Sequence, residues 1–524
     1  MKYISKINNK TFYFICLLLF SFSINQYYGY LGVYPIDTFL FFDSGYRVLN
    51  GHFPFKDFWA VTGPLLDLIQ AFFFKIFGVS WFSYVLHASF FNFLISILTF
   101  FTLMKFKLNI NLSFFYSLLV SIIAYPLAGT PFVDHHAIIL SILALYCFIL
   151  ALETKLNFYW FLIPVFFGLA FFSKQTPSAY IALIVLLCSI VHFVFYFNLK
   201  KIFIFLAGSL FLLSLFLLFI FYSKVSFLSF YQQYILFPLT IGEDRISEFL
   251  FPLEFNRLVT RFKLIHISII ILIIVLIKNI FKNYRYFFEK EFLILISIIF
   301  TSWILILHQL MSLNQKFIFF IIPILLAFSH IYYKKYFEQK KYIVYMLIFL
   351  GIGSTLYYKS SYIDNRRFQE LANVDLNKSI KVNFTNGKLK NLKWITSDYP
   401  DTPENEVDLL KNSLLVIKND KKKKMLITHY QFIAALIPEY ISSPNRTYTH
   451  DSISYPKKGD EYFNEYKDFF VEQIKKNNIQ IIYIIKPIEN YVFNSLINEN
   501  CLKSKKINDI LTSYLLVPCK KLKK

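Results

Sequence analysis

Long apolar runs alternate with short charged segments over the first two thirds of the chain. Several of these runs reach the roughly 18 apolar residues that mark a membrane-spanning helix. The pattern predicts an α-helical polytopic membrane protein with about eleven spans. The first span begins near residue 12, and the others cover residues 81–104, 112–127, 137–152, 158–172, 179–197, 202–222, 264–277, 292–307, 317–331 and 342–356.

The apolar runs stop near residue 358, which divides the chain into two predicted domains. Residues 1–358 form the membrane domain, and residues 359–524 form a soluble domain with mixed charge. Within the second domain, K-M-L-I-T-H-Y (424–430) and I-Q-I-I-Y-I-I (479–485) are typical of buried strands, and residues 460–475 of an amphipathic helix. We therefore expect a small α/β domain at the C-terminus.

The charge balance fits a membrane protein better than a nucleic-acid-binding one. The chain has 524 residues, is 56% hydrophobic and carries a net charge of +22. Its Lys and Arg residues gather in alternate short loops, which the positive-inside rule places in the cytoplasm beside anionic lipid. No nucleic-acid motif is present. We expect a protein of the bacterial inner membrane with a cytoplasmic N-terminus and an extracytoplasmic C-terminal domain.

Five cysteines are divided between the two predicted domains. Cys16, Cys147 and Cys188 lie in apolar runs, where cysteine acts as a small buried side chain. Cys501 and Cys519 lie in the C-terminal domain, and an oxidising compartment would allow them to form a disulfide. No C-x-x-C pair occurs, which argues against a cysteine-based zinc site.

The segment after the first span, residues 37–65, carries five charged residues beside apolar runs: Asp37, Asp43, Arg47, Lys56 and Asp57. Charges so close to lipid are costly, so they are candidates for function. Turn residues indicate a fixed path rather than a flexible connector. An ordinary loop with its charges in water is the alternative, and Asp43 can also pair with Arg47 one helical turn on. The next residues, 64–78, are typical of a helix at the membrane interface.

Further polar groups fall on the same predicted outer face of the bundle. The loop T-P-F-V-D-H-H ends in Asp134, His135 and a second histidine, and it has a plain alternative role in capping the next span. Lys174 follows the fifth span, where a lysine can simply extend to the membrane surface. The remaining candidates are basic and lie in later loops: Arg257, Arg261, His308 and Lys316. Arg257 and Arg261 lie one turn apart and suit either a diphosphate or a lipid headgroup.

The order of these motifs resembles the GT-C superfamily of polytopic glycosyltransferases, which includes protein O-mannosyltransferases, the aminoarabinose transferase of lipid A and oligosaccharyltransferases. The shared pattern is an acidic residue soon after the first helix, then a short helix, then G-x-x-P-[YF]-x-D, then G-P-L before an interfacial helix. Here these features are Asp37, residues 43–49, G-H-F-P-F-K-D (51–57) and G-P-L (63–65). The resemblance covers the chain up to about residue 335.

The resemblance implies transfer of a sugar from a polyprenyl-phosphate or polyprenyl-diphosphate donor to an extracytoplasmic glycan, lipid or protein. A carboxylate acts as general base on the acceptor, and cations stabilise the leaving phosphate. Asp37 matches the family's catalytic acid best, with Asp43 second. The resemblance leaves two roles open for Asp134 and His135. They could hold a divalent cation, Mg²⁺ or Mn²⁺, or they could bind the acceptor. The other implied substrate-binding residues are Arg47, Lys56, Asp57, Lys174, Arg257, Arg261, His308 and Lys316.

Two other classes of membrane protein handle lipid-linked saccharides. A flippase-type transporter would carry ionisable groups and broken helices near the middle of the membrane, whereas these spans are nearly all apolar. A polymerase or ligase typically relies on a large late external loop with Arg and His. The charged motif in the first loop favours the glycosyltransferase.

Overall fold

The computed structural model describes residues 9–247, 254–312, 316–337, 340–384, 387–449, 453–486, 488 and 495–518. The chain divides into two compact units, each assembled from separate stretches. The helical unit comprises Met1–Gly29, Val85–Leu218 and Asp244–Phe368, and the mixed unit comprises Tyr30–Tyr84, Phe219–Glu243 and Gln369–Lys524.

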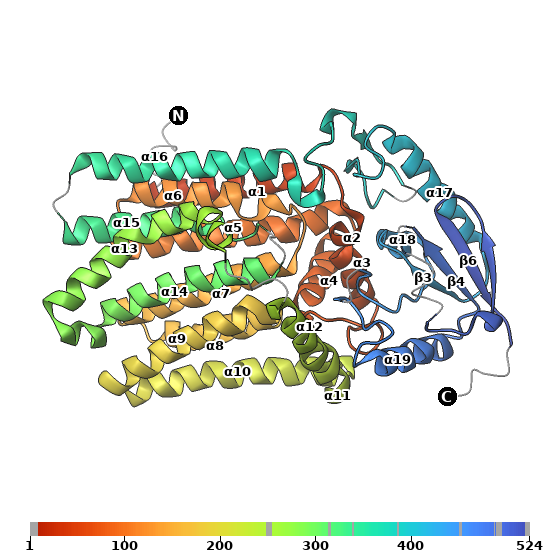
Figure 1. The fold of residues 1–524 in the computed structure, drawn as a ribbon, viewed down its shortest axis with the longest axis horizontal. Helices are drawn as coiled ribbons and strands as arrows, with labels where there is room; N and C mark the ends of the chain where they lie inside the picture. Colours follow the sequence, from red (N-terminus) through yellow and green to blue (C-terminus); the bar gives the residue numbers. More distant parts are fainter. Residues whose placement is uncertain are drawn as a thin grey trace, which may run out of the picture. The chain divides into compact units, whose positions relative to one another are not determined.

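Every predicted span coincides with a helix in Figure 1. Among the described residues, eight helices are long and apolar enough to cross a membrane, which confirms the polytopic helical fold. The remaining three predicted spans lie on α1, α8 and α15. The helices at the predicted spans are α1 (Asn9–Gly29), α5 (Trp81–Lys105), α6 (Ile110–Ile123), α7 (Val133–Glu153), α8 (Phe158–Phe171), α9 (Gln175–Phe195), α10 (Leu199–Ser223), α13 (Lys263–Lys282), α14 (Lys290–Met311), α15 (Ile321–Tyr336) and α16 (Lys341–Tyr358).

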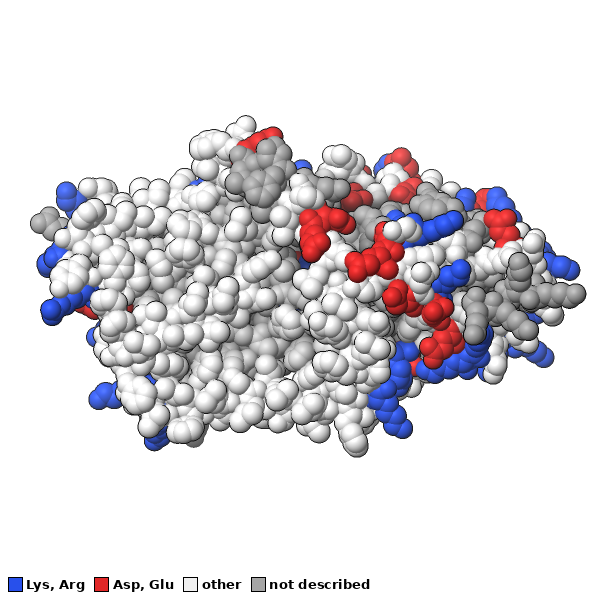
Figure 2. Space-filling model, turned by 60° about the horizontal axis from the view of Figure 1, so that its bottom comes forward, with Lys and Arg blue, Asp and Glu red and all other residues white. Residues whose placement is uncertain are grey.

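Helix α7 forms the core of the helical unit. Its apolar stretch is completely buried, and it packs against α8, α9 and α14. A helix that is apolar on all sides needs neighbours or lipid on every side. Helix α10 shows the opposite case, because only 6% of its apolar stretch is buried. Figure 2 shows a wide uncharged surface over the helices of this unit, with blue lysine and arginine side chains beyond it at one end.

The mixed unit is built on a four-stranded sheet in the order β3-β4-β6-β5. Strand β4 pairs parallel to β3 and antiparallel to β6, and β6 pairs antiparallel to β5. The two predicted buried strands are β3 and β4, and the predicted amphipathic helix is α19. The strands are β1 (Ile380–Lys381), β2 (Lys393–Trp394), β3 (Lys424–Ile427), β4 (Ile481–Ile485), β5 (Leu502–Lys506) and β6 (Leu511–Leu516).

The remaining helices are short or belong to the mixed unit. The α-helices are α2 (Pro35–Thr38), α3 (Leu40–Leu49), α4 (Leu65–Phe77), α11 (Phe227–Tyr231), α12 (Phe237–Arg245), α17 (Pro403–Asn419), α18 (Phe432–Leu436) and α19 (Phe463–Lys476). The other helical turns include η2 (Tyr125–Leu127), η3 (Gln232–Leu236), η5 (Asn256–Thr260), η6 (Tyr284–Phe288), η7 (Lys359–Asp364), η8 (Arg367–Gln369), η9 (Leu376–Lys378) and η10 (Glu499–Cys501). Helix α4 lies where the sequence predicts an interfacial helix.

The first loop folds together with the C-terminal segment in the mixed unit. The predicted division at residue 358 assigns that loop to the membrane domain instead. The backbone N–H of Gly32 donates to Lys393 O at 2.9 Å, and that of Trp59 donates to Pro444 O at 2.7 Å. The Trp59 ring also lies in the same buried cluster as strands β3 and β4. These pairings join stretches more than 300 residues apart, so a pattern along the sequence does not reveal them.

The cysteines fall into two groups. Cys16, Cys147 and Cys188 are free; Cys147 and Cys188 are buried, as predicted, whereas Cys16 is only partly buried. Cys501 is disulfide-bonded, and Cys519, its predicted partner, lies outside the described residues.

Candidate functional site

Asp43 and Arg47 form a buried ion pair on helix α3. The side-chain atoms lie 2.6 Å apart, and the side chains are 2% and 4% exposed. Arg47 also donates to Ser443 O at 2.7 Å and lies 5.1 Å from the centre of the Phe58 ring. Burial raises the pKa of Asp43, although the guanidinium lowers it in part. The ion pair that the spacing of Asp43 and Arg47 allows is present.

A second buried ion pair, absent from the sequence predictions, joins Asp67 on α4 to Arg446. The two groups lie 2.5 Å apart, and Asp67 is fully buried. Arg446 also donates to the backbone oxygen of Thr62 at 2.9 Å, and its guanidinium lies 5.9 Å from the Phe58 ring that Arg47 contacts. Asp67 carried a signal, since it is a carboxylate in a helix that is apolar apart from Asp67, Gln70 and Lys75. Its partner lies 379 residues away.

Contacts of Asp57 and Lys56 stabilise the fold of the loop. Asp57 accepts from the Phe53 backbone N–H at 2.8 Å and pairs with Lys476 of α19 at 2.9 Å. Lys56 donates to Ser223 O at 2.7 Å. Both side chains are therefore occupied by contacts within the mixed unit.

Asp37 lies in the first turn of α2 and is half-buried, so it is more exposed than Asp43 or Asp57. Its charge acts on Tyr34, because burial and the Asp37 carboxylate together raise the pKa of that phenol. Among the three carboxylates of the first loop, Asp37 is the most accessible to a substrate.

The helical unit brings together three residues that the sequence predicted separately. The Asp134 carboxylate lies at the start of α7. It accepts hydrogen bonds from Lys174 Nζ at 2.8 and 3.0 Å and from His308 Nε2 at 2.8 Å. Lys174 precedes α9, and His308 lies near the end of α14. The second ring nitrogen of His308, Nδ1, is buried and has no hydrogen-bond partner among the described residues.

This arrangement does not fit a divalent cation at Asp134 and His135. Both Asp134 oxygens already accept hydrogen bonds from the Lys174 ammonium, and one of them also accepts a hydrogen bond from His308 Nε2. His135 directs Nε2 to the Ala124 carbonyl oxygen at 3.0 Å instead. In the part of the chain that the structure describes, no group of three or more His, Cys, Asp or Glu side chains could hold a metal.

A cluster of cations surrounds Tyr362, also in the helical unit. Lys316 Nζ lies 4.7 Å and Arg367 Cζ 5.4 Å from the centre of the Tyr362 ring. Burial and the neighbouring Arg367 and Arg261 lower the pKa of Lys316 to about 8. Burial also lowers the pKa of Arg261, and the charges of Arg367 and Arg257 add to that effect. Arg261 therefore lies within electrostatic reach of Arg257 and Arg367, and Lys316 within reach of Arg261 and Arg367.

Among the described residues, no carboxylate forms an ion pair with Arg261, Lys316 or Arg367. We call Arg257, Arg261, Lys316 and Arg367 the cation cluster. The sequence predictions included all but Arg367. Arg367 could have been included among the candidates, because it is the second of two adjacent arginines shortly after the last span.

The fold is that of a polytopic helical membrane protein, and its helical unit gathers the four cations of the cation cluster. Residues 61–222 match the family model of dolichyl-phosphate-mannose-protein mannosyltransferases. This match confirms the resemblance to the GT-C superfamily and supports a membrane glycosyltransferase of the GT-C type. The matched range includes Asp134, His135 and Lys174 but begins after Asp37, Asp43 and Asp57. A comparison with curated proteins gave no match.

Proposed function

We propose that the protein transfers a sugar from a polyprenyl-phosphate or polyprenyl-diphosphate donor to an acceptor hydroxyl outside the cytoplasm. The observation that carries this proposal is the cation cluster in a chain that matches a glycosyltransferase family. The acceptor is a glycan, a lipid or a protein. The proposal keeps a cytoplasmic N-terminus, because the lysine-rich loops alternate along the chain.

The cation cluster binds the donor phosphate. Cations held close together repel one another, and the lowered pKa of Lys316 is the expected result of that repulsion and of burial. The phosphate carries one negative charge in a polyprenyl-phosphate sugar and two in the diphosphate; either would reduce the repulsion and accept charge-assisted hydrogen bonds. The same groups stabilise the charge that develops on the phosphate as the glycosidic bond breaks.

The half-buried ring of Tyr362, packed on two buried aromatic rings beside the cluster, suits the isoprenoid chain. The rings of Phe319 and Tyr358 stack with centres 3.9 Å apart, and Tyr362 stacks on Tyr358 at 5.7 Å. Since Tyr362 also contacts Lys316 and Arg367, one group of side chains offers both charge and apolar surface. A lipid phosphate requires both.

Asp37 acts as the general base. The transfer needs a carboxylate that can accept the proton of the acceptor hydroxyl. Asp43 and Asp57 are both buried. Asp37 is more exposed than either, which favours it over Asp43 for this role.

Asp134 positions Lys174 and His308. Because the carboxylate neutralises Lys174, that lysine is less suited to phosphate binding than the cation cluster. The imidazole of His308 is fixed through Nε2, which leaves Nδ1 to accept a hydrogen bond from a substrate.

The test is sugar transfer in membranes supplied with a labelled polyprenyl-phosphate sugar. We expect Lys316→Gln and Arg367→Gln each to lower kcat/KM for the donor by roughly 10- to 100-fold, the loss expected for one charge-assisted hydrogen bond. Arg285→Gln is the matched control, since Arg285 is an exposed cation in η6. Unchanged transfer in both cluster variants, or an equal loss in the control, would contradict the proposal.

A further inference from the structure

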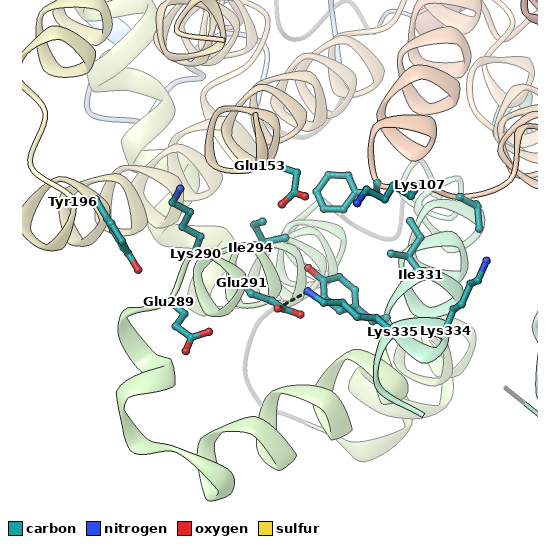
Figure 3. A pocket seen from close by; sticks show the side chains of 13 residues that line it. Lys107, Glu153, Tyr196, Glu289, Lys290, Glu291, Ile294, Ile331, Lys334 and Lys335 are labelled. Atoms are coloured by element: carbon teal, nitrogen blue, oxygen red, sulfur yellow. Dashed lines mark hydrogen bonds and ion pairs between the residues drawn. The ribbon is translucent and has the colours of Figure 1, made fainter. Parts of the chain in front are cut away.

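A cavity of about 850 Å³ lies at the ends of several helices of the helical unit (Figure 3). Its wall comes from the residues after α5, the last residue of α7, the residue after α9, the start of α14 and the end of α15. The volume falls within the roughly 300–1,000 Å³ that is usual for small-molecule sites. The lining residues that matter here are Lys107, Glu153, Glu289, Lys290, Glu291, Lys334 and Lys335.

The cavity lies at the opposite end of the same helices from Asp134 and His308. On α7, Asp134 and Glu153 are separated by about 28 Å at a rise of 1.5 Å per residue. On α14, Glu291 and His308 are separated by about 26 Å. The hydrocarbon core of a bilayer is about 30 Å thick. The cavity and the Asp134 group therefore face opposite surfaces of the membrane, and the cavity is no part of the site described above.

Both signs of charge line the cavity. Lys335 pairs with Glu291 at 2.7 Å, and Lys290 Nζ lies 5.5 Å from the centre of the Tyr196 ring. Figure 3 shows the carboxylate of Glu153 and the ammonium of Lys107 around the same space as the Lys335–Glu291 pair. Among the described residues, neither the Glu153 nor the Glu289 carboxylate forms an ion pair.

The rest of the wall is apolar and lies at headgroup depth. Phe106, Ile294 and Ile331 border the charged side chains. The helix ends place this wall where a bilayer changes from hydrocarbon to headgroups, so phospholipid is always present beside it. An amphiphile would place its polar end among the charges and its apolar part against these three residues.

We propose that this cavity binds a phospholipid whose headgroup carries both a phosphate and a primary ammonium group. Lysines of the wall bind the phosphate, and Glu153 and Glu289 bind the ammonium. A purely anionic headgroup would meet three carboxylates, and a purely cationic ligand would meet four lysines. A headgroup with both charges suits both sets, because each of its charges can lie beside side chains of the opposite sign.

Native mass spectrometry of the full-length protein in detergent tests this proposal. The probes are phosphatidylethanolamine, phosphatidylcholine and phosphatidylglycerol with the same acyl chains. Phosphatidylcholine has the same phosphate but no N–H donors, and phosphatidylglycerol has no cation. We expect phosphatidylethanolamine to be retained about tenfold more strongly than the other two, which corresponds to about one charge-assisted hydrogen bond.

Two variants and a control assign the preference to the cavity. The double variant Glu153→Gln with Glu289→Gln should bind the three lipids alike, and Lys107→Gln should weaken retention of all three. Glu254→Gln is the control, because Glu254 is an exposed carboxylate that does not line the cavity. Equal retention of the three lipids by the unmodified protein would overturn the proposal, whatever the variants do. A preference for phosphatidylglycerol, or an unchanged preference in the double variant, would overturn it as well.

Discussion

The pair Asp67–Arg446 provides a sharp test of how the mixed unit is held together. Arg446→Met removes the guanidinium and leaves the Asp67 carboxylate buried without its cation. It also removes hydrogen bonds to the backbone and hydroxyl oxygens of Thr62. The C-terminal segment thereby loses a direct attachment to the loop that carries Asp37.

The size of the effect follows from burial. Asp67 is fully buried and Arg446 is 4% exposed. Removing one partner of such a pair typically destabilises a protein by about 3–5 kcal/mol. For a unit of this size, 1 kcal/mol shifts the melting temperature by about 2–4 °C, so we expect a fall of roughly 10 °C.

The assay is proteolysis of the C-terminal segment in the detergent-solubilised full chain as the temperature is raised. The control is Lys506→Met, which removes an exposed ion pair with Asp509 and should shift nothing measurable. A double variant, Arg446→Met with Asp67→Leu, should recover part of the loss because no charge stays buried alone. The reasoning is refuted if the single variant melts like the control, or if the two substitutions destabilise additively.

Three further predictions concern the helical unit. The value of kcat/KM for the donor should fall above about pH 8, because Lys316 is charged below its lowered pKa and neutral above it. In Lys316→Arg, the fall should begin at higher pH. Asp134→Asn should destabilise the solubilised protein by about 3–5 kcal/mol by leaving Lys174 without its partner, and adding Lys174→Met should restore part of the stability in thermal unfolding. Thermal unfolding should be unaffected by EDTA or by added Mg²⁺ or Mn²⁺, since the Asp134 oxygens are already engaged; a clear metal-dependent shift would contradict this.

Features set by neighbouring residues could be predicted from the sequence. The apolar runs located the spans, because length and hydropathy are local properties. The spacing of Asp43 and Arg47 allowed the ion pair that the structure contains, because residues four apart meet on a helix. Strands β3 and β4 were visible as short apolar runs with flanking polar residues.

Features that depend on distant partners could not be predicted in the same way. Asp134 and His308 were both candidates, but nothing in their spacing of 174 residues shows that they touch. Arg446 lies in a soluble segment, and only folding brings it to Asp67. The packing of the first loop against the C-terminal segment was not predicted for the same reason. Hydropathy locates membrane spans, but it does not show how the loops between them pack.

Sugar transfer by Asp37→Asn tests the central claim most directly. The membranes receive a labelled polyprenyl-phosphate sugar, and Asp43→Asn and the unmodified protein are assayed at matched protein levels. Loss of a general base lowers the rate by about 10²- to 10⁴-fold. We predict that loss for Asp37→Asn, whereas Asp43→Asn should lower the melting temperature by breaking its pair with Arg47. Wild-type transfer by Asp37→Asn would contradict the assignment of the base and the mechanism built on it.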